Sequence, residues 1–408
     1  MVNNMSDNHE AFYGLPQEVK FCKKCVISNQ RPSSTIEFKN EKGEKKSVIN
    51  FSDNDICSAC IFHAEKETTI DWALRDEHLR KLLSSFRSDD GSYDVIVPGS
   101  GGKDSAYTAH ILKYKYGMNP LTVTWAPHLY TDIGIKNFQE WMHTGGLDNI
   151  LYTPNGKLHR EMTRNAFHNL LHPFQPFIVG QRIIGPAMAK RFGVKLVMYG
   201  ENQAEYGNAI EENSNPIMNM DFFSSEDPLK MKFGGVSMED YIDSGQYTKD
   251  DFAPYIAPKQ KDLIDSGVEV HYLGYYLKWD PQECYYYAVE NTGFQANPER
   301  TEGTYSKYSS IDDKIDPFHY LTTLIKFGIG RCTYDASQEV RNGKITREEA
   351  VYLVNKYDHE FPNKYFDEFC KYISTSKEEF HKILDSHRSP HIWKKNEDGL
   401  WELRNKLK

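Results

Sequence analysis

The sequence has no excess of positive charge, little glycine and proline, and no long uncharged apolar run. Lysine and arginine total 49 against 58 acidic residues, and the formal net charge of −9 is the wrong sign for a chain held mainly to phosphate backbones. Nucleic acid is therefore not the partner that we expect. With 27 Gly, 18 Pro and 39% hydrophobic residues among 408, the composition is typical of globular domains rather than of disordered or collagen-like chains.

A membrane span and a secretory signal are also missing from the pattern. The stretch 165–181 is free of charged residues, but its histidines, amides and prolines would leave polar groups unsatisfied in a bilayer. Acidic residues interrupt the first 21 positions, so they do not form the apolar segment of a signal peptide. We therefore expect a cytoplasmic protein without a membrane span.

Cysteine is scarce, and four of the seven cysteines fall in two close pairs. Cys22 and Cys25 form one pair and Cys57 and Cys60 form the other, and each pair places two thiolates on one tight turn. Two such turns complete a tetrahedral site, so the spacing predicts a structural Zn²⁺ ion that stabilises a segment with little apolar core of its own. An iron–sulfur cluster and unligated core cysteines are the alternatives.

Strand and helix patterns alternate through the middle of the chain and divide it into three regions. Short apolar runs predict strands at 93–97, 121–125, 149–152, 195–199 and 268–273, with helical periodicity between most of them. This alternation indicates an α/β fold, a Rossmann-like parallel sheet with helices on both faces and a ligand at the carboxyl ends of the strands. We place the cysteine segment at 1–70, the α/β domain at 71–330 and a C-terminal helical region at 331–408. The regularity fades at about 208–260, which is either a long functional loop or a mobile cap.

The strongest signal for chemistry is the loop Gly99–Ser105, GSGGKDS, between a predicted strand and a predicted helix. It is not a Walker A loop because Asp104 follows Lys103, and Asp104 also replaces the third glycine of a dinucleotide fingerprint. Small residues let backbone amides approach an anion, and the helix N-terminus adds its dipole. Lys103 supplies a positive charge, and Asp104 can hold a Mg²⁺ ion that bridges phosphates. The loop therefore predicts a pyrophosphate cradle, and a tight turn without a ligand is the alternative.

Further candidate residues follow the later strands. Glu201 and Asn202 come after the strand at 195–199, where they would orient substrate or metal, unless they form a polar turn and helix cap. Trp125 ends the strand at 121–125 and is either a site residue or ordinary core. Lys326 and Arg331 flank an uncharged glycine-bearing segment and are either site cations or solvated side chains.

The segment Ser100–Ser105 resembles the SGGxDS loop of the PP-loop ATP pyrophosphatases. With the two cysteine pairs and the segments 199–202 (YGEN) and 325–331 (IKFGIGR), most of the chain is similar to the N-acetyl sugar amidotransferases. These enzymes act in the biosynthesis of surface polysaccharides, such as LPS O-antigen, and of nonulosonic acids of the pseudaminic and legionaminic type. The resemblance implies that ATP is cleaved to AMP and pyrophosphate, that an amide oxygen is adenylated, and that ammonia converts an acetamido group of a sugar to an acetamidino group.

The resemblance also implies roles for single residues. Lys103, Asp104, Lys326 and Arg331 would be catalytic, and the two later cations would close on the leaving pyrophosphate. Glu201 and Asn202 would meet the substrate, and Asp104 would hold Mg²⁺. The ATP contacts would be Gly99, Ser100, Gly101, Gly102, Lys103, Asp104, Ser105, Trp125 and Gly200.

Ammonia would come from partner proteins. The chain has Val2 where glutaminases of the N-terminal-nucleophile type have Cys, and Gly330–Tyr334 lacks the second glycine of the elbow type. The resemblance implies a glutaminase subunit and a barrel subunit similar to those of imidazole glycerol phosphate synthase. Two other functions remain open: a PP-loop tRNA thiolase, which also carries paired cysteines, and a nucleotide-binding sensor without turnover.

Overall fold

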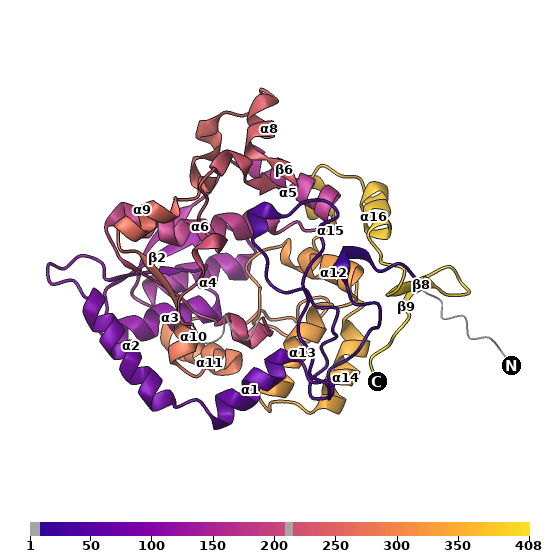
Figure 1. Cartoon of the computed structure of the whole chain (residues 1–408), viewed down its shortest axis with the longest axis horizontal. Coiled ribbons are helices and arrows are strands. Elements are labelled where there is room, and N and C mark those ends of the chain that lie inside the picture. The colour runs from indigo at the N-terminus through magenta and orange to yellow at the C-terminus, as the bar shows by residue number, and fades with distance from the viewer. Residues whose placement is uncertain (1–8, 209–214) are drawn as a thin grey trace.

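A parallel sheet of five strands forms the centre of the computed structural model, which describes residues 9–208 and 215–408 (Figure 1). All five predicted strands form: β1 (Val95–Pro98), β2 (Pro120–Trp125), β3 (Asp148–Tyr152), β4 (Leu196–Tyr199) and β7 (Glu269–Tyr272). Their order is β3-β2-β1-β4-β7, and every neighbouring pair is parallel. The apolar run at 95–97 is fully buried because helices cover both faces of the sheet.

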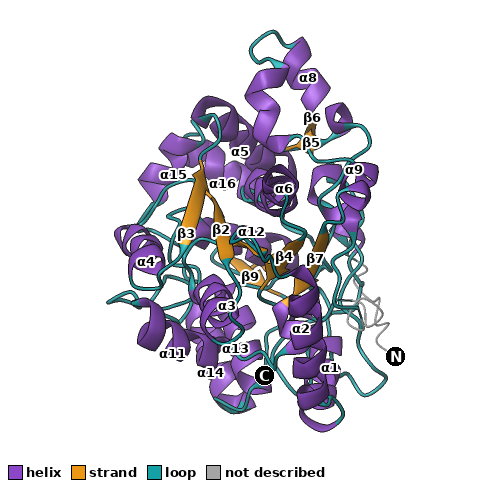
Figure 2. Cartoon of the chain, turned by 90° about the vertical axis from the view of Figure 1, so that its left-hand side faces the viewer, coloured by secondary structure: helices purple, strands orange, loops and turns teal. Residues whose placement is uncertain are grey.

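Helices α5 (Gly156–Leu170) and α6 (Gln175–Phe192) cover one face, whereas α3 (Lys103–Tyr114) and α11 (Pro281–Thr292) cover the other (Figure 2). Helices α2 (Trp72–Phe86) and α4 (Asp132–His143) contribute to the α3 side. The apolar side chains form a separate buried cluster on each face, so the fold class predicted from the sequence is confirmed. Among the described residues, no helix is long and apolar enough to cross a membrane.

The segment between β4 and β7 is a packed extension in its described part, whereas residues 209–214 of the predicted loop or cap lie outside the described residues. It contains β5 (Lys232–Phe233), β6 (Val236–Ser237), α8 (Met238–Asp243) and α9 (Gln260–Asp265), and α8 projects at the top of Figure 1. Phe233, Phe252 and Tyr255 are fully buried in the cluster that also holds α5 and α6. Hydrophobic contact with the helical layer therefore anchors this extension.

The C-terminal region consists of helices followed by a short hairpin. The helices are α12 (Asp316–Phe327), α13 (Arg331–Arg341), α14 (Arg347–Tyr357), α15 (Phe366–Tyr372) and α16 (Lys377–Ser386). Aromatic rings of α12, α15 and α16 join the core around α5, with Phe167 stacked on Phe380 at a centroid distance of 4.9 Å. The pairing of β8 (Trp393–Lys395) with β9 (Trp401–Leu403) is an element that the sequence analysis does not predict.

The N-terminal segment packs on the C-terminal helices. Its regular structure is mainly α1 (Ser58–Thr68), with short helical turns and isolated bridges before it. The four paired cysteines share one buried cluster with Phe327 of α12 and Trp393 of β8. The two ends of the described chain are therefore joined by a common apolar core.

The α10 helix (Leu273–Tyr276) follows β7 and contacts α2.

Candidate functional site

The predicted site lies where the order of the strands in the sheet reverses, between β1 and β4. The chain passes from β1 to β2 and β3 on one side and to β4 and β7 on the other, which leaves a crevice at the carboxyl ends of β1 and β4. A cavity of about 470 Å³ opens there. The predicted residues that line it are Gly99, Ser100, Gly101, Gly102, Lys103, Asp104, Ser105, Gly200 and Glu201. The structure therefore brings together the loop after β1 and the turn after β4.

The shape of the loop depends on its close contact with α4. Gly101 has a φ of +82°, and a Cβ atom on it would lie 2.8 Å from the Cα atom of Phe138. A residue with a side chain is disfavoured by the left-handed backbone and by the neighbouring helix. Gly102 caps α3 in an extended conformation, and the first N–H groups of a helix have no acceptor within it. This geometry suits an anion such as phosphate.

Lys103 and Asp104 form an ion pair at the start of α3. The Lys103 side chain is buried, and its Nζ atom lies 2.5 Å from Oδ2 of Asp104. Burial lowers the pKa of Lys103, but the carboxylates of Asp104 and Glu201 raise that pKa by more. The second Asp104 oxygen, Oδ1, is buried without a hydrogen-bond partner among the described residues. A carboxylate oxygen in this state fits a Mg²⁺ ion, which prefers oxygen ligands.

Acidic side chains outnumber basic ones around this cavity. Burial and the Asp104 carboxylate raise the pKa of Glu201 to about 7, although Lys103 and the donated hydrogen bond of the Tyr206 hydroxyl lower it. Burial also raises the pKa of Asp316 to about 7. Crowded carboxylates with raised pKa values favour the arrival of a cation. The acidic lining residues are Asp104, Glu201, Asp312, Asp313 and Asp316, and the basic ones are Lys103 and Arg182.

Trp125 and Asn202 are not among the residues that line the cavity. Trp125 lies in the apolar core and stacks on Tyr152, with ring centroids 5.9 Å apart. Asn202 caps the short helix Gln203–Tyr206, where its side-chain oxygen accepts a hydrogen bond from the Ala204 amide. Their side chains therefore take the core and cap alternatives, and a contact of either residue with a ligand stays a prediction.

Lys326 is also separated from the cavity. Its buried ammonium donates a 3.0 Å hydrogen bond to the Leu170 carbonyl. Burial and the charge of Lys46 lower the pKa of Lys326 to about 7, and Glu37 opposes this shift. The expectation that Lys326 closes on pyrophosphate is therefore not supported by its position on the inner side of α12.

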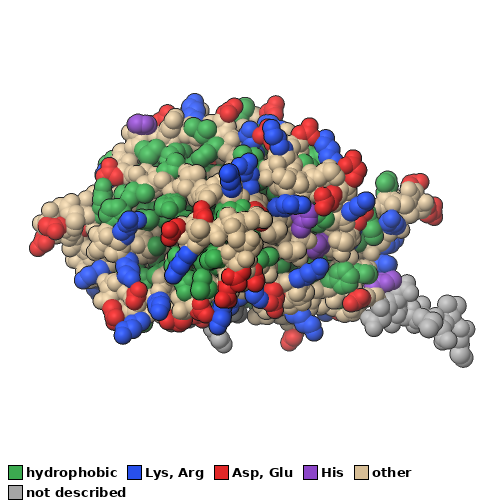
Figure 3. Space-filling model, turned by 90° about the horizontal axis from the view of Figure 1, so that it is seen from above, with side chains coloured by type: hydrophobic (Ala, Val, Ile, Leu, Met, Phe, Trp, Pro, Cys, Tyr) green, Lys and Arg blue, Asp and Glu red, His purple; other side chains and the backbone are tan. Residues whose placement is uncertain are grey.

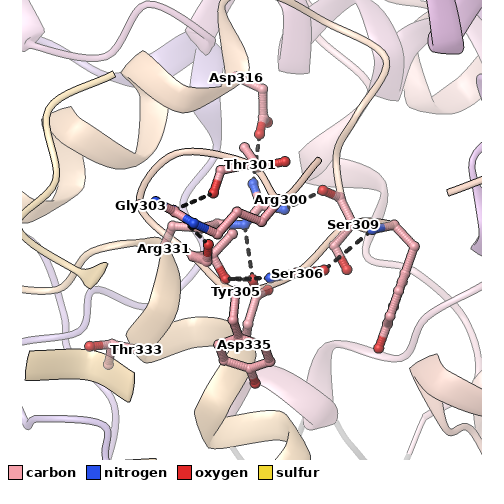
Figure 4. A network of polar contacts seen from close by, with 12 residues as sticks. Arg300, Thr301, Gly303, Tyr305, Ser306, Ser309, Asp316, Arg331, Thr333 and Asp335 are labelled. Carbon is pink, nitrogen blue, oxygen red and sulfur yellow. Dashed lines mark hydrogen bonds and ion pairs between the residues drawn. The ribbon is translucent and has the colours of Figure 1, made fainter. Parts of the chain in front are cut away.

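Arg331 lies at the start of α13 and lines a second cavity of about 520 Å³, which adjoins the first. Its guanidinium is already paired: Nη1 lies 2.6 Å from Asp316, and Nε lies 3.3 Å from Asp335. Nη2 donates to the carbonyl of Ser309, as Figure 4 shows within the surrounding polar network. Arg331 therefore fixes the loop before α12, and its charge is largely neutralised by carboxylates.

Several residues that line the cavity are not among the site residues predicted from the sequence. Asp312, Asp313 and Asp316 lie in the segment IDDKID just before and at the start of α12, and this dense group of acids was a detectable signal. Arg182 and His319 come from the interior of helices, where no local pattern marks them. Of the described residues of 208–260, Met218 alone lines the first cavity, so the described extension contributes little to its wall.

The four paired cysteines converge on one point. Their Sγ atoms all lie within 4.8 Å of one another, with 3.8 Å between Cys22 and Cys60 and 3.7 Å between Cys25 and Cys57. All four side chains are buried, and the distances fit a single metal ion held by four thiolates. The predicted convergence of the four cysteines is therefore confirmed, and their arrangement is consistent with a metal site.

Glu201 gives the site a testable pH dependence. Its folded-state pKa of about 7 lies above its ordinary value, so between these values the folded protein binds more protons than the unfolded chain and loses stability as the pH rises. Glu201→Gln should remove this pH-dependent decrease in the free energy of unfolding, which amounts to up to about 3 kcal/mol. Without Mg²⁺, the melting temperature of the variant relative to wild type should therefore be higher at pH 8 than at pH 5. An equal difference at both pH values would contradict the assignment.

Comparisons with known proteins give one family match. Residues 302–408 match the family described as LPS biosynthesis protein WbpG-like, C-terminal domain. An uncharacterized protein of Methanocaldococcus jannaschii is 32% identical over 82 residues, which is 19% of this chain and 27% of that protein. The chain thus spans about a quarter of the length of this curated relative.

Two solved structures are similar at low scores. NMN synthetase from Francisella tularensis has 14% identity and a TM-score of 0.30 over 74% of this chain and 96% of that one. The U34-tRNA thiolase NcsA from Methanococcus maripaludis, solved with its [4Fe-4S] cluster, has 12% identity and a TM-score of 0.30 over 88% and 95%. The comparisons thus identify a similarity of residues 302–408 to the C-terminal domain of WbpG-like LPS biosynthesis proteins.

Proposed function

We propose that this protein is an ATP-dependent amidotransferase that converts an acetamido group of a sugar to an acetamidino group for LPS or a related surface glycan. The observation that carries the proposal is the ion pair between buried Lys103 and half-buried Asp104 at the start of α3, beside Glu201, in which one Asp104 oxygen has no hydrogen-bond partner among the described residues. The LPS biosynthesis match of residues 302–408 supports the substrate class.

The chemistry requires activation of the amide oxygen, because an amide carbonyl is a poor electrophile toward ammonia and oxide is a poor leaving group. The oxygen attacks the α-phosphorus of ATP, and the bond from that phosphorus to the oxygen of pyrophosphate breaks. Ammonia then attacks the carbonyl carbon, and the carbon–oxygen bond breaks so that the amide oxygen leaves as part of AMP. The ammonia nitrogen stays in the amidine, which gains a proton and a positive charge.

The residues at the cavity supply charge and position. Lys103 and the amides at the start of α3 offset the negative charge that develops on departing pyrophosphate. Asp104 and Glu201 would hold Mg²⁺, which would neutralise phosphate charge when bound. Lys326 takes no part in this scheme, since its ammonium is engaged by Leu170. Arg331 acts indirectly by holding Asp316.

We infer that the metal at the cysteines is zinc with a structural role. A tetrahedral ion with Zn–S bonds of about 2.3 Å places its sulfur atoms about 3.8 Å apart, close to the spacing of the two short Sγ pairs. A four-iron cluster holds its thiolates on different iron atoms and needs a wider set. Four thiolates on Zn²⁺ carry a net charge of −2, and the guanidinium groups of Arg31 and Arg341 lie near enough to interact with these cysteines.

A tRNA thiolase is the alternative function. Such an enzyme needs a cysteine or a cluster that delivers sulfur to the adenylated base. Cys284 is close enough to Asp104 and Lys103 to interact with their charges, but it is not among the residues that line either cavity. Burial raises its pKa well above the ordinary range, so the thiol stays protonated and is a poor nucleophile. On the face shown in Figure 3, acidic and basic side chains are interspersed, which does not favour a long RNA contact.

The function is tested with purified protein, ATP, Mg²⁺, ammonium and a panel of acetamido sugars labelled with ¹⁸O at the amide carbonyl. We expect AMP that contains one ¹⁸O atom and a sugar product that is lighter by about one mass unit than its unlabelled parent and carries an added cation. Simple hydrolysis of ATP would leave the label in the sugar. AMP release that requires tRNA, with the sugars unaltered, would favour the thiolase.

Ammonia supply is tested in the same assay. We propose that a glutaminase subunit and a barrel subunit, similar to those of imidazole glycerol phosphate synthase, deliver ammonia to this chain, since most free ammonia is protonated at neutral pH. Glutamine in place of ammonium should therefore give no product with this chain alone. Turnover with glutamine alone would contradict the proposal.

Asp104→Asn should keep the fold and lower AMP formation by about a hundredfold or more, because the amide keeps the shape of the carboxylate but loses its charge toward the metal. Asp243→Asn, at the exposed end of α8, is the matched control and should retain normal turnover. Melting curves of both variants check folding. Normal AMP formation by Asp104→Asn would show that the Asp104 carboxylate does not hold a metal ion needed for the reaction.

Cys25→Ser should lower the bound zinc and the melting temperature together, because metal binding contributes directly to folding at such sites. Cys370→Ser is the matched control, since Cys370 is buried but lies in a different apolar cluster. It should keep its zinc even where it loses some stability. Elemental analysis that returns iron, or a coloured protein, would exclude the zinc site.

A further inference from the structure

The second cavity differs from the first in the sign of its charge. The two cavities share the charged residues Lys103, Asp104, Arg182 and Glu201, so they meet at the ion pair. Among the described residues that line the second cavity but not the first, the basic ones are Arg31, Arg331 and Arg341, and the acidic one is Asp335. A basic cavity of about 520 Å³ beside the phosphate loop is suited to an anionic group.

Arg31 stands out among these arginines because it reaches the cavity from the N-terminal segment with an unused donor. Its guanidinium carbon lies 5.6 Å from the ring centre of Tyr206 and 5.7 Å from that of Tyr334, so two aromatic rings hold it. The Nη1 atom is buried and has no hydrogen-bond partner among the described residues. A buried guanidinium donor left in this state is costly, and a bound anion would satisfy it.

The other arginines are engaged more fully. Arg331 is paired with Asp316 and Asp335, as described above. Arg341 donates a 3.0 Å hydrogen bond from Nη2 to the Glu205 carbonyl, and its charge lies close to the cysteine cluster. Arg341 nonetheless lines the same cavity, so it adds positive charge beside Arg31.

The phosphates of ATP have a better place than this basic cavity. Gly99, Ser100, Gly101 and Gly102 line the first cavity and are not among the residues that line the second. Since the loop amides lie at the first cavity, and Asp104 and Glu201 border both cavities, the triphosphate fits the first cavity with its Mg²⁺ ion at the boundary. The second cavity is then left for the acceptor, and its reacting atom would lie where the two cavities meet.

We propose that Arg31, supported by the charge of Arg341, forms an anion subsite that binds a phosphate or carboxylate group of the acceptor sugar. This inference rests on the proposed function in one respect, because it takes the second cavity as the chamber for the acceptor. It means that the protein selects acceptors that carry a negative charge away from the acetamido group. The N-terminal cysteine segment would then contribute to substrate selection as well as to stability.

The test is isothermal titration of the full-length protein saturated with Mg²⁺ and α,β-methylene ATP, which keeps the first cavity filled. The probes are uridine diphosphate, N-acetylneuraminate and neutral N-acetylglucosamine. At least one anionic probe should bind at least tenfold more tightly than the neutral sugar. Preference for uridine diphosphate identifies a phosphate group, as in a nucleotide-linked acceptor, and preference for N-acetylneuraminate identifies a carboxylate.

Arg31→Gln should weaken binding of the preferred anion by about tenfold or more, because a charge-assisted hydrogen bond is lost. Arg31→Lys should restore part of the affinity, since it keeps the charge but not the planar fork. Arg164→Gln, on the exposed side of α5, is the matched control and should bind like wild type. Zinc content and melting temperature show whether each variant is folded.

Two results would overturn the subsite. One is equal binding of neutral and anionic probes by the wild type, which needs no variant. The other is unchanged anion affinity in folded Arg31→Gln. Failure of α,β-methylene ATP to bind would instead contradict the proposed ATP dependence, and it is measured separately before the probes are added. The two proposals therefore fail in different experiments.

Discussion

A buried ammonium beside two carboxylates is the interaction on which the rest of the site depends. Lys103 lies where the N-terminus of α3 approaches the turn after β4, so its pairing with Asp104 and its attraction to Glu201 join these two elements. Loss of charge on one side would leave a buried charge on the other without compensation, which is strongly unfavourable. The group is therefore stable as a set. Within this set, the buried Oδ1 atom of Asp104 has no hydrogen-bond partner among the described residues, and a bound cation would satisfy it.

The walls around this group come from parts of the chain that are far apart in sequence. Buried Lys66 of α1 donates to Glu205 at 2.8 Å, and Ser58 donates to the Gly207 carbonyl at 2.7 Å, so the N-terminal segment is fixed beside the turn after β4. The cysteine cluster packs on Phe327 and Trp393 from the other side. A metal ion at the cysteines would therefore stabilise the position of Arg31 as well as the fold of the N-terminal segment, because the same segment carries Arg31 to the second cavity.

The sequence predicts the parts of this arrangement that depend on local pattern. Apolar runs predict all five strands, and the order of strand, glycines and helix predicts the loop. Both predictions succeed because the local backbone conformation and burial depend on consecutive residues. Trp125 and Asn202 lie at the ends of strands that are correctly located, and Lys326 lies near the end of α12, but none of the three lines the first cavity. Side-chain direction there depends on neighbours such as Tyr152 and Leu170, which pack against these positions only after the chain has folded. The β8–β9 hairpin is missed because strands of three residues are too short for a periodicity.

The division of charge between the two cavities would allow an acidic chain to accept the two negatively charged substrates that we propose. With a net charge of −9, the protein as a whole repels polyanions, so attraction must be local. The first cavity offers helix amides, Lys103 and carboxylates that would attract a divalent cation, and the second offers arginines that would contact an anion directly. Phosphates that arrive with a metal ion suit the acidic cavity, whereas an anion without one suits the basic cavity. In the proposed reaction each cavity would thereby disfavour the substrate of the other, and the two reacting groups would meet at the shared boundary at Lys103 and Asp104.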